Sequence, residues 1–419
     1  MSVTSSDCNC YYTEHYFVEK VQNRTLRLHL SYDGSDESIQ DQLTKNYGLV
    51  NDDGDLDLTA EEFGVLKMIL QTERERRLNL WGSHNHRKML CSNLFPEEKR
   101  NIQAYHLKTI NDNEGESWLT KSCMEALDLT KRNSSGGDPT LISAKELLAV
   151  AGGEEIVKGR VFALPILNKK SCKLLDNELC LFADTCKDIK GRPNTMNRNG
   201  VLLDEASMSA GVTSALLENV ITPLARCLFS VAKENNSESC ETEEKKTSDR
   251  EHDLSLCERD DMDMVQCMCD TLDHHHAFTV NYRFDPNIDS SFSGKNNYHD
   301  RDLALHFDNS EVIMNMLLND EDDFDGGELS FEGPSKASPP SFGNMGNAKP
   351  VPFQHKLGWV VIHLGSELHR VMPIDEGDRR NLIMWCRSST HRLNHGCPLC
   401  GQADQLIKPV LHNYMNKST

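Results

Sequence analysis

The stretch Leu305-His306-Phe307-Asp308, together with Leu368-His369 further along the chain, decides how this sequence is interpreted. Side chains at positions i and i+2 of a β-strand point to the same face. His306 and Asp308 can therefore reach one metal ion from a single strand, while the residue between them points away into packing. His369 lies 61 residues after Asp308 and has to arrive from a different strand. The spacing predicts a metal site shared by two strands.

The three side chains also indicate which metal chemistry fits. Two imidazoles and one carboxylate leave coordination positions open, which is the facial triad of non-haem Fe(II) oxygenases. A His-x-Asp motif alone is weak evidence for a metal site in a chain with 17 His and 65 acidic residues. The motif gains weight only if predicted strands surround it. The candidate strands are Phe278–Tyr282, Val312–Leu318, Phe324–Phe331, residues 359–369 and residues 379–387, with Pro373 and Gly377 in the turn before the last one. His363 is the rival candidate for the third ligand.

Four segments resemble a known family. They are KGRPNTMNRNGVLLDE (190–205), HFDNSEVIMNMLL (306–318), FDGGELSF (324–331) and HLGSELHRVMPIDEGDRRNLIMW (363–385). These segments are similar to the prolyl-4-hydroxylase-type 2-oxoglutarate/Fe(II) dioxygenases. The resemblance covers residues 158–405, while the first 157 residues match more loosely. An acidic segment between Ala232 and His274 departs from the family pattern.

The resemblance implies an α+β fold whose core is a double-stranded β-helix, or jelly roll, with flanking helices. Its catalytic iron ligands would be His306, Asp308 and His369. Arg379, ten residues after His369, would hold the distal carboxylate of 2-oxoglutarate, and this spacing favours His369 over His363. Tyr282 would add a hydroxyl donor for the cosubstrate, and L-ascorbate would be required as well.

The implied activity is oxidation of an unidentified protein or small-molecule substrate by O2, with release of succinate and CO2. Hydroxylation and demethylation both stay open, and so does the oligomeric state. A competing hypothesis is a non-catalytic scaffold that keeps the barrel and binds partners through its N-terminal helices. The intact triad and Arg379 favour the enzyme, because a scaffold needs none of them. The polar cluster Arg192, Asn194, Thr195, Met196 and Asn197 is either a loop that closes the barrel or a lid that faces the substrate.

Composition limits the partners and the compartment. The net charge of −20 disfavours nucleic acid as a general partner, because phosphate backbones repel an acidic surface. We find no signal-peptide pattern and no apolar stretch long enough to span a membrane. The 15 Cys residues form no small-domain framework and indicate reduced thiols. These features predict a cytoplasmic or nuclear protein. Both compartments are reducing, which suits Fe(II).

The pattern along the chain predicts two main parts. Residues 1–157 form a mostly helical N-terminal region, and residues 158–405 form the dioxygenase domain. Residues 234–273 are an acidic insert in that domain, and residues 406–419 are a C-terminal tail. The insert is predicted to be disordered, because residues 234–270 hold 13 acidic and 4 basic side chains and few apolar ones.

Local periodicity predicts the individual elements of the first half of the chain. The expected elements are a short strand or a hairpin in 15–32, helices at 36–47 and 58–80, largely helical structure in 97–157, a strand at 160–166, and helices at 171–186 and 206–233, the last with a break near Pro223.

An EF-hand-like segment is the first of three weaker metal signals. Asn51–Phe63 places oxygen ligands at EF-hand spacing, but Leu56 occupies the position that requires Gly. A polar turn that caps the following helix is therefore the preferred interpretation.

Cysteine and histidine clusters supply the other two signals. Cys397-Pro-Leu-Cys400 has the spacing of half a zinc site and could be completed by Cys8 and Cys10 if the termini meet. Ordinary thiols or a redox pair are the alternatives. The triplet His274–His276 could bind soft metals with Cys257, Cys267 and Cys269, although adventitious binding by a flexible insert is the favoured explanation.

Overall fold

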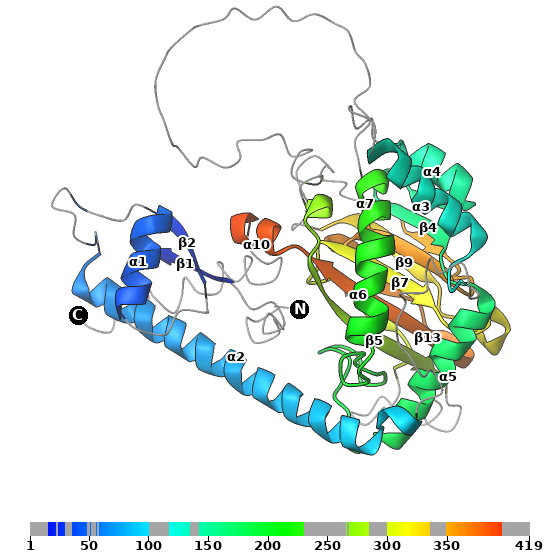
Figure 1. Ribbon diagram of the computed structural model, residues 1–419, viewed down its shortest axis with the longest axis horizontal. Helices are drawn as coiled ribbons and strands as arrows, with labels where there is room; N and C mark the ends of the chain where they lie inside the picture. The colour runs from blue at the N-terminus through cyan, green and yellow to red at the C-terminus, as the bar shows by residue number, and fades with distance from the viewer. Residues whose placement is uncertain are drawn as a thin grey trace, which may run out of the picture.

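The computed structural model describes residues 16–21, 24–29, 36–47, 51, 56, 58–99, 117–134, 142–229, 265, 268–284, 300–335 and 349–395. Two facing antiparallel sheets form the main body, helices cover the outer face of the larger sheet, and one long helix leads away from it (Figure 1). None of the described helices is long and apolar enough to cross a membrane.

From β5 onward the chain crosses repeatedly between the two sheets. The larger sheet has the order β3 (Glu154–Val157), β4 (Val161–Pro165), β11 (Trp359–Leu364), β7 (Val312–Leu317), β13 (Ile374–Arg387) and β5 (His274–Arg283), with β8 (Phe324–Gly326) also paired to β13. The smaller sheet has the order β10 (Val351–Phe353), β9 (Leu329–Pro334), β12 (Glu367–Val371) and β6 (Leu303–His306). This arrangement is a double-stranded β-helix, so the predicted α+β fold is confirmed.

Strand alternation divides the buried residues between two cores. Along β7, Val312, Met314 and Met316 belong to the core beneath the helices, whereas Ile313 and Leu317 belong to the core between the sheets. Strands buried on both faces read as nearly continuous apolar runs, and this explains the run seen in the sequence. The inner core surrounds the candidate metal site.

The outer core includes side chains of the helices α3 (Lys121–Ser134), α4 (Ala144–Ala151) and α5 (Lys169–Thr185), and of the helical turns between Ser209 and Leu228. The predicted helix at 171–186 is confirmed as α5. The predicted break near Pro223 is wrong, because helical structure continues through it into α7 (Thr222–Leu228). Pro223 is the second residue of α7 and follows directly after a π-helical turn at Leu217–Ile221.

The N-terminal part begins with the antiparallel pair β1 (Tyr16–Val21) and β2 (Arg24–His29), followed by α1 (Asp36–Tyr47). Helix α2 (Ala60–Leu94) starts at a capping box in which Thr59 Oγ1 accepts from the Glu62 N–H at 3.2 Å, and the Glu62 carboxylate accepts from the Thr59 N–H at 2.9 Å. Glu62 would be the last ligand of the EF-hand-like segment, so the structure supports the capping interpretation.

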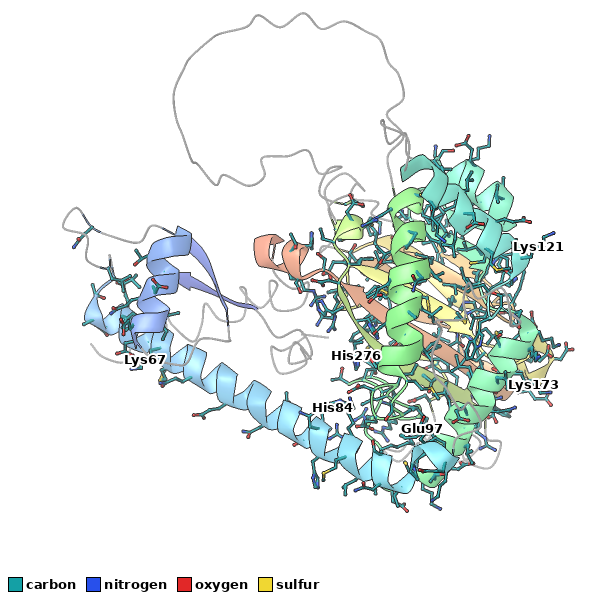
Figure 2. All side chains as sticks on the ribbon, viewed as in Figure 1. Lys67, His84, Glu97, Lys121, Lys173 and His276 are labelled. Carbon is teal, nitrogen blue, oxygen red and sulfur yellow. The ribbon has the colours of Figure 1, made fainter. Side chains whose placement is uncertain are left out.

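Helix α2 extends 14 residues beyond its predicted end at residue 80. Its last turns pack on the main body, where Cys91 and Phe95 are buried and the Phe95 ring meets the Phe182 ring at 5.6 Å. Figure 2 shows the helix leaving the main body beyond His84 toward Lys67. Because this contact is with residues far along the chain, local periodicity could not predict where the helix ends.

The end of the predicted disordered insert is part of the fold. Met268, Cys269 and Leu272 are buried in the outer core, so the prediction of disorder is wrong for this end of the insert. The triplet His274–His276 begins β5, and the Nε2 atom of His275 lies 2.6 Å from Thr213 Oγ1. These imidazoles therefore belong to a packed strand, and not to a flexible metal-binding tract.

Two further predictions need correction or lie outside the described residues. Gly377 lies inside β13, just after a register shift between Ile374 and Glu376, and not in a turn; its φ of 76° and its close approach to the Asp323 carbonyl both require glycine. The predictions for the candidate zinc cysteines Cys8, Cys10, Cys397 and Cys400, the thiols Cys257 and Cys267, residues 234–264 of the insert and the tail 406–419 lie outside the described residues.

Candidate metal centre and cosubstrate cavity

Two paired strands bring the three predicted ligands together. His306 on β6 lies directly opposite His369 on β12, and their ring centroids are 4.3 Å apart. Asp308 lies two residues beyond the end of β6, with one carboxylate oxygen 3.6 Å from His306 Nε2 and the other 3.5 Å from His369 Nε2. Their ligand atoms all lie within 4.8 Å of one another, the one such group in the described part of the chain.

Backbone carbonyls fix which nitrogen of each imidazole faces the centre. His306 Nδ1 lies 2.8 Å from the Ala304 carbonyl, and His369 Nδ1 lies 3.0 Å from the Glu367 carbonyl. A carbonyl can only accept, so each Nδ1 carries the proton and each Nε2 presents a lone pair toward Asp308. This orientation by an outer hydrogen bond is the usual arrangement of metal-binding His.

Burial sets the protonation of the site. It lowers the pKa of both His306 and His369 to about 4, so both imidazoles are neutral near pH 7. Burial also raises the pKa of Asp308, while His306 and Arg387 act in the opposite direction. Neutral imidazoles beside a buried carboxylate are the charge state that a divalent cation requires of its ligands.

A tight backbone contact holds Asp308 in place after the strand ends. The Asp308 N–H donates to the Gly365 carbonyl at 2.8 Å, and the Gly365 N–H donates to the Glu311 carbonyl at 3.0 Å. A Cβ atom on Gly365 would overlap the Ser310 carbonyl, so this turn between β11 and β12 needs glycine.

The rival ligand His363 lies next to the centre but outside the converging group. Its ring centroid is 4.7 Å from that of His369, and its Nδ1 lies 2.8 Å from the Leu364 carbonyl. His363 is fully buried, and its Nε2 has no hydrogen-bond partner. The geometry therefore favours His369 as the third ligand, with His363 packed behind it.

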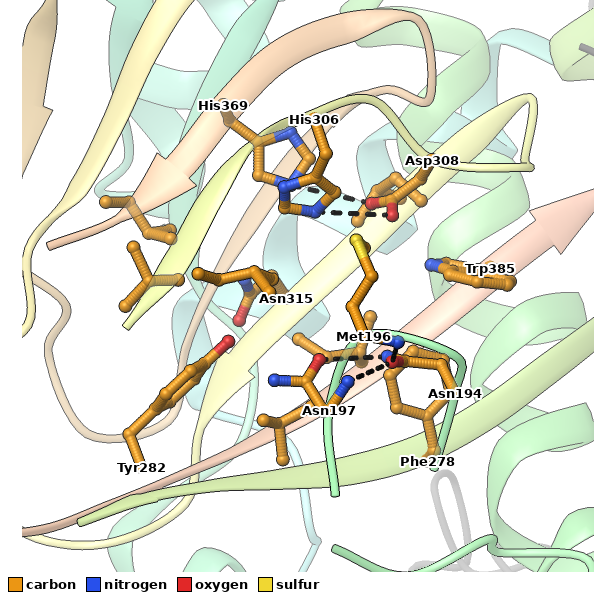
Figure 3. Close-up of a pocket in the computed structure, with 16 residues that line it drawn as sticks. Asn194, Met196, Asn197, Phe278, Tyr282, His306, Asp308, Asn315, His369 and Trp385 are labelled. Atoms are coloured by element: carbon orange, nitrogen blue, oxygen red, sulfur yellow. Dashed lines mark hydrogen bonds and ion pairs between the residues drawn. The ribbon is translucent and has the colours of Figure 1, made fainter. Parts of the chain in front are cut away.

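A cavity opens beside the three ligands, and Figure 3 shows the side chains that line it. Besides the three ligands, its lining includes Asn194, Met196, Asn197, Phe278, Tyr282, Asn315 and Trp385. Apolar side chains from both sheets, such as Leu303, Leu329 and Val371, complete its walls. The mixture of apolar walls and a few polar groups is typical of a small-molecule site.

The polar cluster noted in the sequence forms one edge of this cavity. Asn194 Oδ1 accepts from the N–H groups of Met196 and Asn197 at 2.8 and 2.6 Å, and Figure 3 shows Met196 reaching toward Asp308. Arg192 donates to the Thr195 carbonyl at 3.1 Å and braces the turn from its exposed side. The segment is therefore a self-bonded loop whose tip faces the candidate metal centre.

Tyr282 and Arg379 are opposite partners on β5 and β13. Tyr282 lines the cavity, whereas Arg379 lies behind it, with its guanidinium carbon 5.7 Å from the centre of the Tyr282 ring. Arg379 Nη1 donates to the Gly327 carbonyl and Nη2 lies 2.9 Å from His355 Nδ1. Burial lowers the pKa of Arg379 to about 10, so the group stays charged near pH 7.

Sequence reasoning missed three polar or aromatic residues of this region. Asn315 was visible as the one polar residue in the apolar run Val312–Leu318, and Trp385 ended a quoted motif without a role. No sequence pattern pointed to His355, because it lies in the connection between β10 and β11 and its hydrogen-bond partners are far from it in the sequence.

Comparison with known proteins agrees with this geometry. A family model described as an OGFOD2-like domain matches residues 140–233. The 2-oxoglutarate and iron-dependent oxygenase domain-containing protein 2 of Xenopus tropicalis is 27% identical over 411 residues, which are 97% of this chain and 91% of the relative. The Homo sapiens protein of the same name is 26% identical over 405 residues, or 96% and 90% of the two chains. The chain belongs to the 2-oxoglutarate/Fe(II) oxygenase family.

Within this family the chain is a homologue of the 2-oxoglutarate and iron-dependent oxygenase domain-containing protein 2 along almost its whole length. The match includes the N-terminal region, which resembled the family only loosely. A prolyl 4-hydroxylase structure from Phytophthora capsici is 15% identical, covers 66% of this chain and 68% of its own, and has a TM-score of 0.33. A likeness this weak adds nothing to what the strands show. Family membership implies Fe(II) and 2-oxoglutarate.

Proposed function

We propose that this chain is a dioxygenase that uses Fe(II), O2 and 2-oxoglutarate to hydroxylate a C–H bond of a protein or small molecule, with L-ascorbate supporting turnover. The observation that carries the proposal is the convergence of His306, Asp308 and His369 at the edge of a cavity, with both Nε2 atoms facing the carboxylate. The proposed dioxygenase domain is residues 158–405.

The donor set fits Fe(II). Two neutral imidazoles and one carboxylate leave open positions on the metal, and these positions would face the cavity. Within the described residues, the two neutral imidazoles are the only titratable nitrogen groups within 4.0 Å of the Asp308 oxygens, so no Lys or Arg competes with a cation for them. Bound Fe(II) would supply O2 activation, which in this family couples oxygen insertion to the conversion of 2-oxoglutarate into succinate and CO2.

The surroundings of Arg379 fit the distal carboxylate of 2-oxoglutarate. Arg379 is 1% exposed, has no carboxylate partner within ion-pair distance among the described residues, and its Nε has no hydrogen-bond partner. A buried charge without a counter-ion is costly, and an anionic ligand would relieve that cost. The Tyr282 hydroxyl would donate to the same carboxylate from the cavity wall.

The remaining side chains would orient the substrate and exclude water. Carbonyl partners keep the Nδ1 protons of both His ligands away from the metal, so no proton has to leave before the metal binds. The apolar walls limit water near the reacting bond. The loop tip at Asn194 and Met196 would contact the prime substrate, and Arg192 would keep this loop in shape.

The test is succinate formation from 2-oxoglutarate in air with Fe(II) and ascorbate, in wild type, His369→Ala and Arg379→Ala. We expect turnover in the wild type and loss in both variants. Matched controls are His86→Ala on the exposed face of α2 and Arg283→Ala at the exposed end of β5, which should retain turnover. Turnover that survives His369→Ala would refute the site. A wild type that binds neither metal nor 2-oxoglutarate would favour a non-catalytic scaffold.

A further inference from the structure

A buried histidine contacts Arg379, the arginine proposed to hold the distal carboxylate of the cosubstrate. His355 is 2% exposed and lies between β10 and β11, with its ring edge-on to Phe353 at 5.5 Å. Its Nδ1 lies 2.9 Å from Arg379 Nη2 and 3.2 Å from Asn381 Nδ2. Its Nε2 lies 3.2 Å from the Asn315 carbonyl.

These contacts permit one protonation state of His355. A guanidinium nitrogen can only donate, so Nδ1 has to accept and carries no proton. The Asn315 carbonyl can only accept, so the proton is on Nε2. His355 is therefore a neutral acceptor toward Arg379, and burial followed by the nearby Arg379 charge lowers its pKa well below the ordinary value.

The chemical nature of this acceptor has a consequence for Arg379. A carboxylate at this place would orient the guanidinium but would also neutralise it, and an ionic ligand would then gain little. A neutral imidazole orients the guanidinium and leaves its charge uncompensated. The Gly327 carbonyl, the other acceptor on Arg379, is neutral as well.

We propose that His355 is a positioning residue that aims Arg379 as a neutral acceptor and so preserves its charge for the distal carboxylate of 2-oxoglutarate. This inference rests on the proposed function. His355 also connects the arginine to the cavity wall, because Asn381 donates both to His355 and to the Asn315 side chain at 2.7 Å, and Asn315 lines the cavity.

The experiment measures calorimetric binding of two probes to the full chain loaded with Mn²⁺ and kept free of O2. The probes are 2-oxoglutarate and 2-oxopentanoate, which has the same five carbons and the same keto acid but lacks the distal carboxylate. The ratio of their dissociation constants reports only what the distal carboxylate contributes. In wild type we expect the ratio to favour 2-oxoglutarate roughly tenfold or more.

Three variants separate charge from shape. In His355→Asn the amide oxygen takes the place of Nδ1, and the ratio should stay within about threefold of wild type. His355→Asp has the same shape but adds a negative charge, and the ratio should fall close to one. His355→Gln stays neutral but places its amide nearer the Nε2 position, away from Arg379, and should also lower the ratio.

Each outcome decides the matter. A wild-type ratio retained in both His355→Asp and His355→Gln would overturn the proposal, and so would a ratio lost equally in His355→Asn and His355→Gln. The Mn²⁺ affinity should stay the same in all variants that melt as the wild type does, and if His355→Asp does not fold, the Asn and Gln pair alone gives the test. A wild type that binds Mn²⁺ but prefers neither probe would refute the proposed function itself, whereas failure of the variants alone refutes only the role of His355.

Discussion

Two of the histidine–carboxylate clusters in the described part of the chain differ in how open they are to a ligand. In the candidate metal centre, His306 and His369 flank Asp308, and the described residues supply no basic side chain to pair with it. In the second cluster, His84 of α2 lies 2.8 Å from Asp204 and 3.6 Å from Glu205. These two carboxylates are saturated by other donors.

The donors of the second cluster come from both sides of an interface. Arg87 Nε lies 2.9 Å from Glu205 and Lys88 Nζ lies 2.7 Å from Asp204, both from α2, while the Gly191 N–H donates to Glu205 at 2.7 Å. The cluster thereby fastens α2 to the base of the loop that faces the cavity. Both clusters contain histidine and carboxylate groups, so it is the balance of charge around the carboxylates that distinguishes a ligand site from a structural one.

The largest expected effect breaks the open cluster. His369→Ala leaves two of three ligands and should weaken Mn²⁺ binding by more than the roughly 10- to 100-fold that loss of an outer hydrogen-bond partner costs. Wild type at a metal concentration about 100 times the dissociation constant should gain about 2.7 kcal/mol of unfolding free energy, and the variant should gain almost none. Thermal melts with and without Mn²⁺ measure this. An equal gain in both proteins would contradict the assignment.

Breaking the closed cluster should lower the stability of the fold and leave metal binding unchanged, whereas His369→Ala acts on metal binding. Glu205→Ala removes the buried acceptor of Arg87 and the Gly191 N–H, and should lower the free energy of unfolding by roughly 3 kcal/mol, the low end for a buried pair because Arg87 is partly exposed. Urea unfolding measures it. Mn²⁺ affinity should be unchanged, and a large loss of metal binding would show that the two clusters are coupled.

The smallest effect concerns the half-exposed Asp204 and its dependence on pH. Burial alone would raise the pKa of Asp204, but hydrogen bonds from His84 and Lys88 lower it from 3.8 to about 2. The carboxylate therefore stabilises the fold above pH 3.8 and loses this contribution as pH falls through about 2. Asp204→Asn should be less stable than wild type at pH 7, and the difference should shrink toward pH 2.

Lys88→Ala provides the matched control for the Asp204 series. Its pair with Asp204 is exposed and should contribute only about 0.2–1 kcal/mol at pH 7. Melting curves of both variants across pH 2–7 make the comparison. A stability difference between Asp204→Asn and wild type that grows as pH falls would contradict the assignment of the lowered pKa to Asp204.

Local sequence determined much of the fold and identified the candidate metal ligands. The two-residue spacing of His306 and Asp308 indicated one shared metal site, although Asp308 lies just beyond the end of β6, and alternating or apolar runs located most of the strands of the double-stranded β-helix. These features depend on backbone geometry within a few residues, so they can be read directly from the chain. The same is true of the capping box that begins α2, with Thr59 and Glu62 three residues apart.

Only the tertiary structure decided the rest, because it depends on which distant segments become neighbours. The pairing of β6 with β12 placed His369 opposite His306 and left His363 behind it. The length of α2 depends on its contacts with Asp204 and Glu205, more than 100 residues away. The neutral acceptor for Arg379 comes from a connection with no pattern of its own, since the chemistry of His355 is set by the groups packed around it.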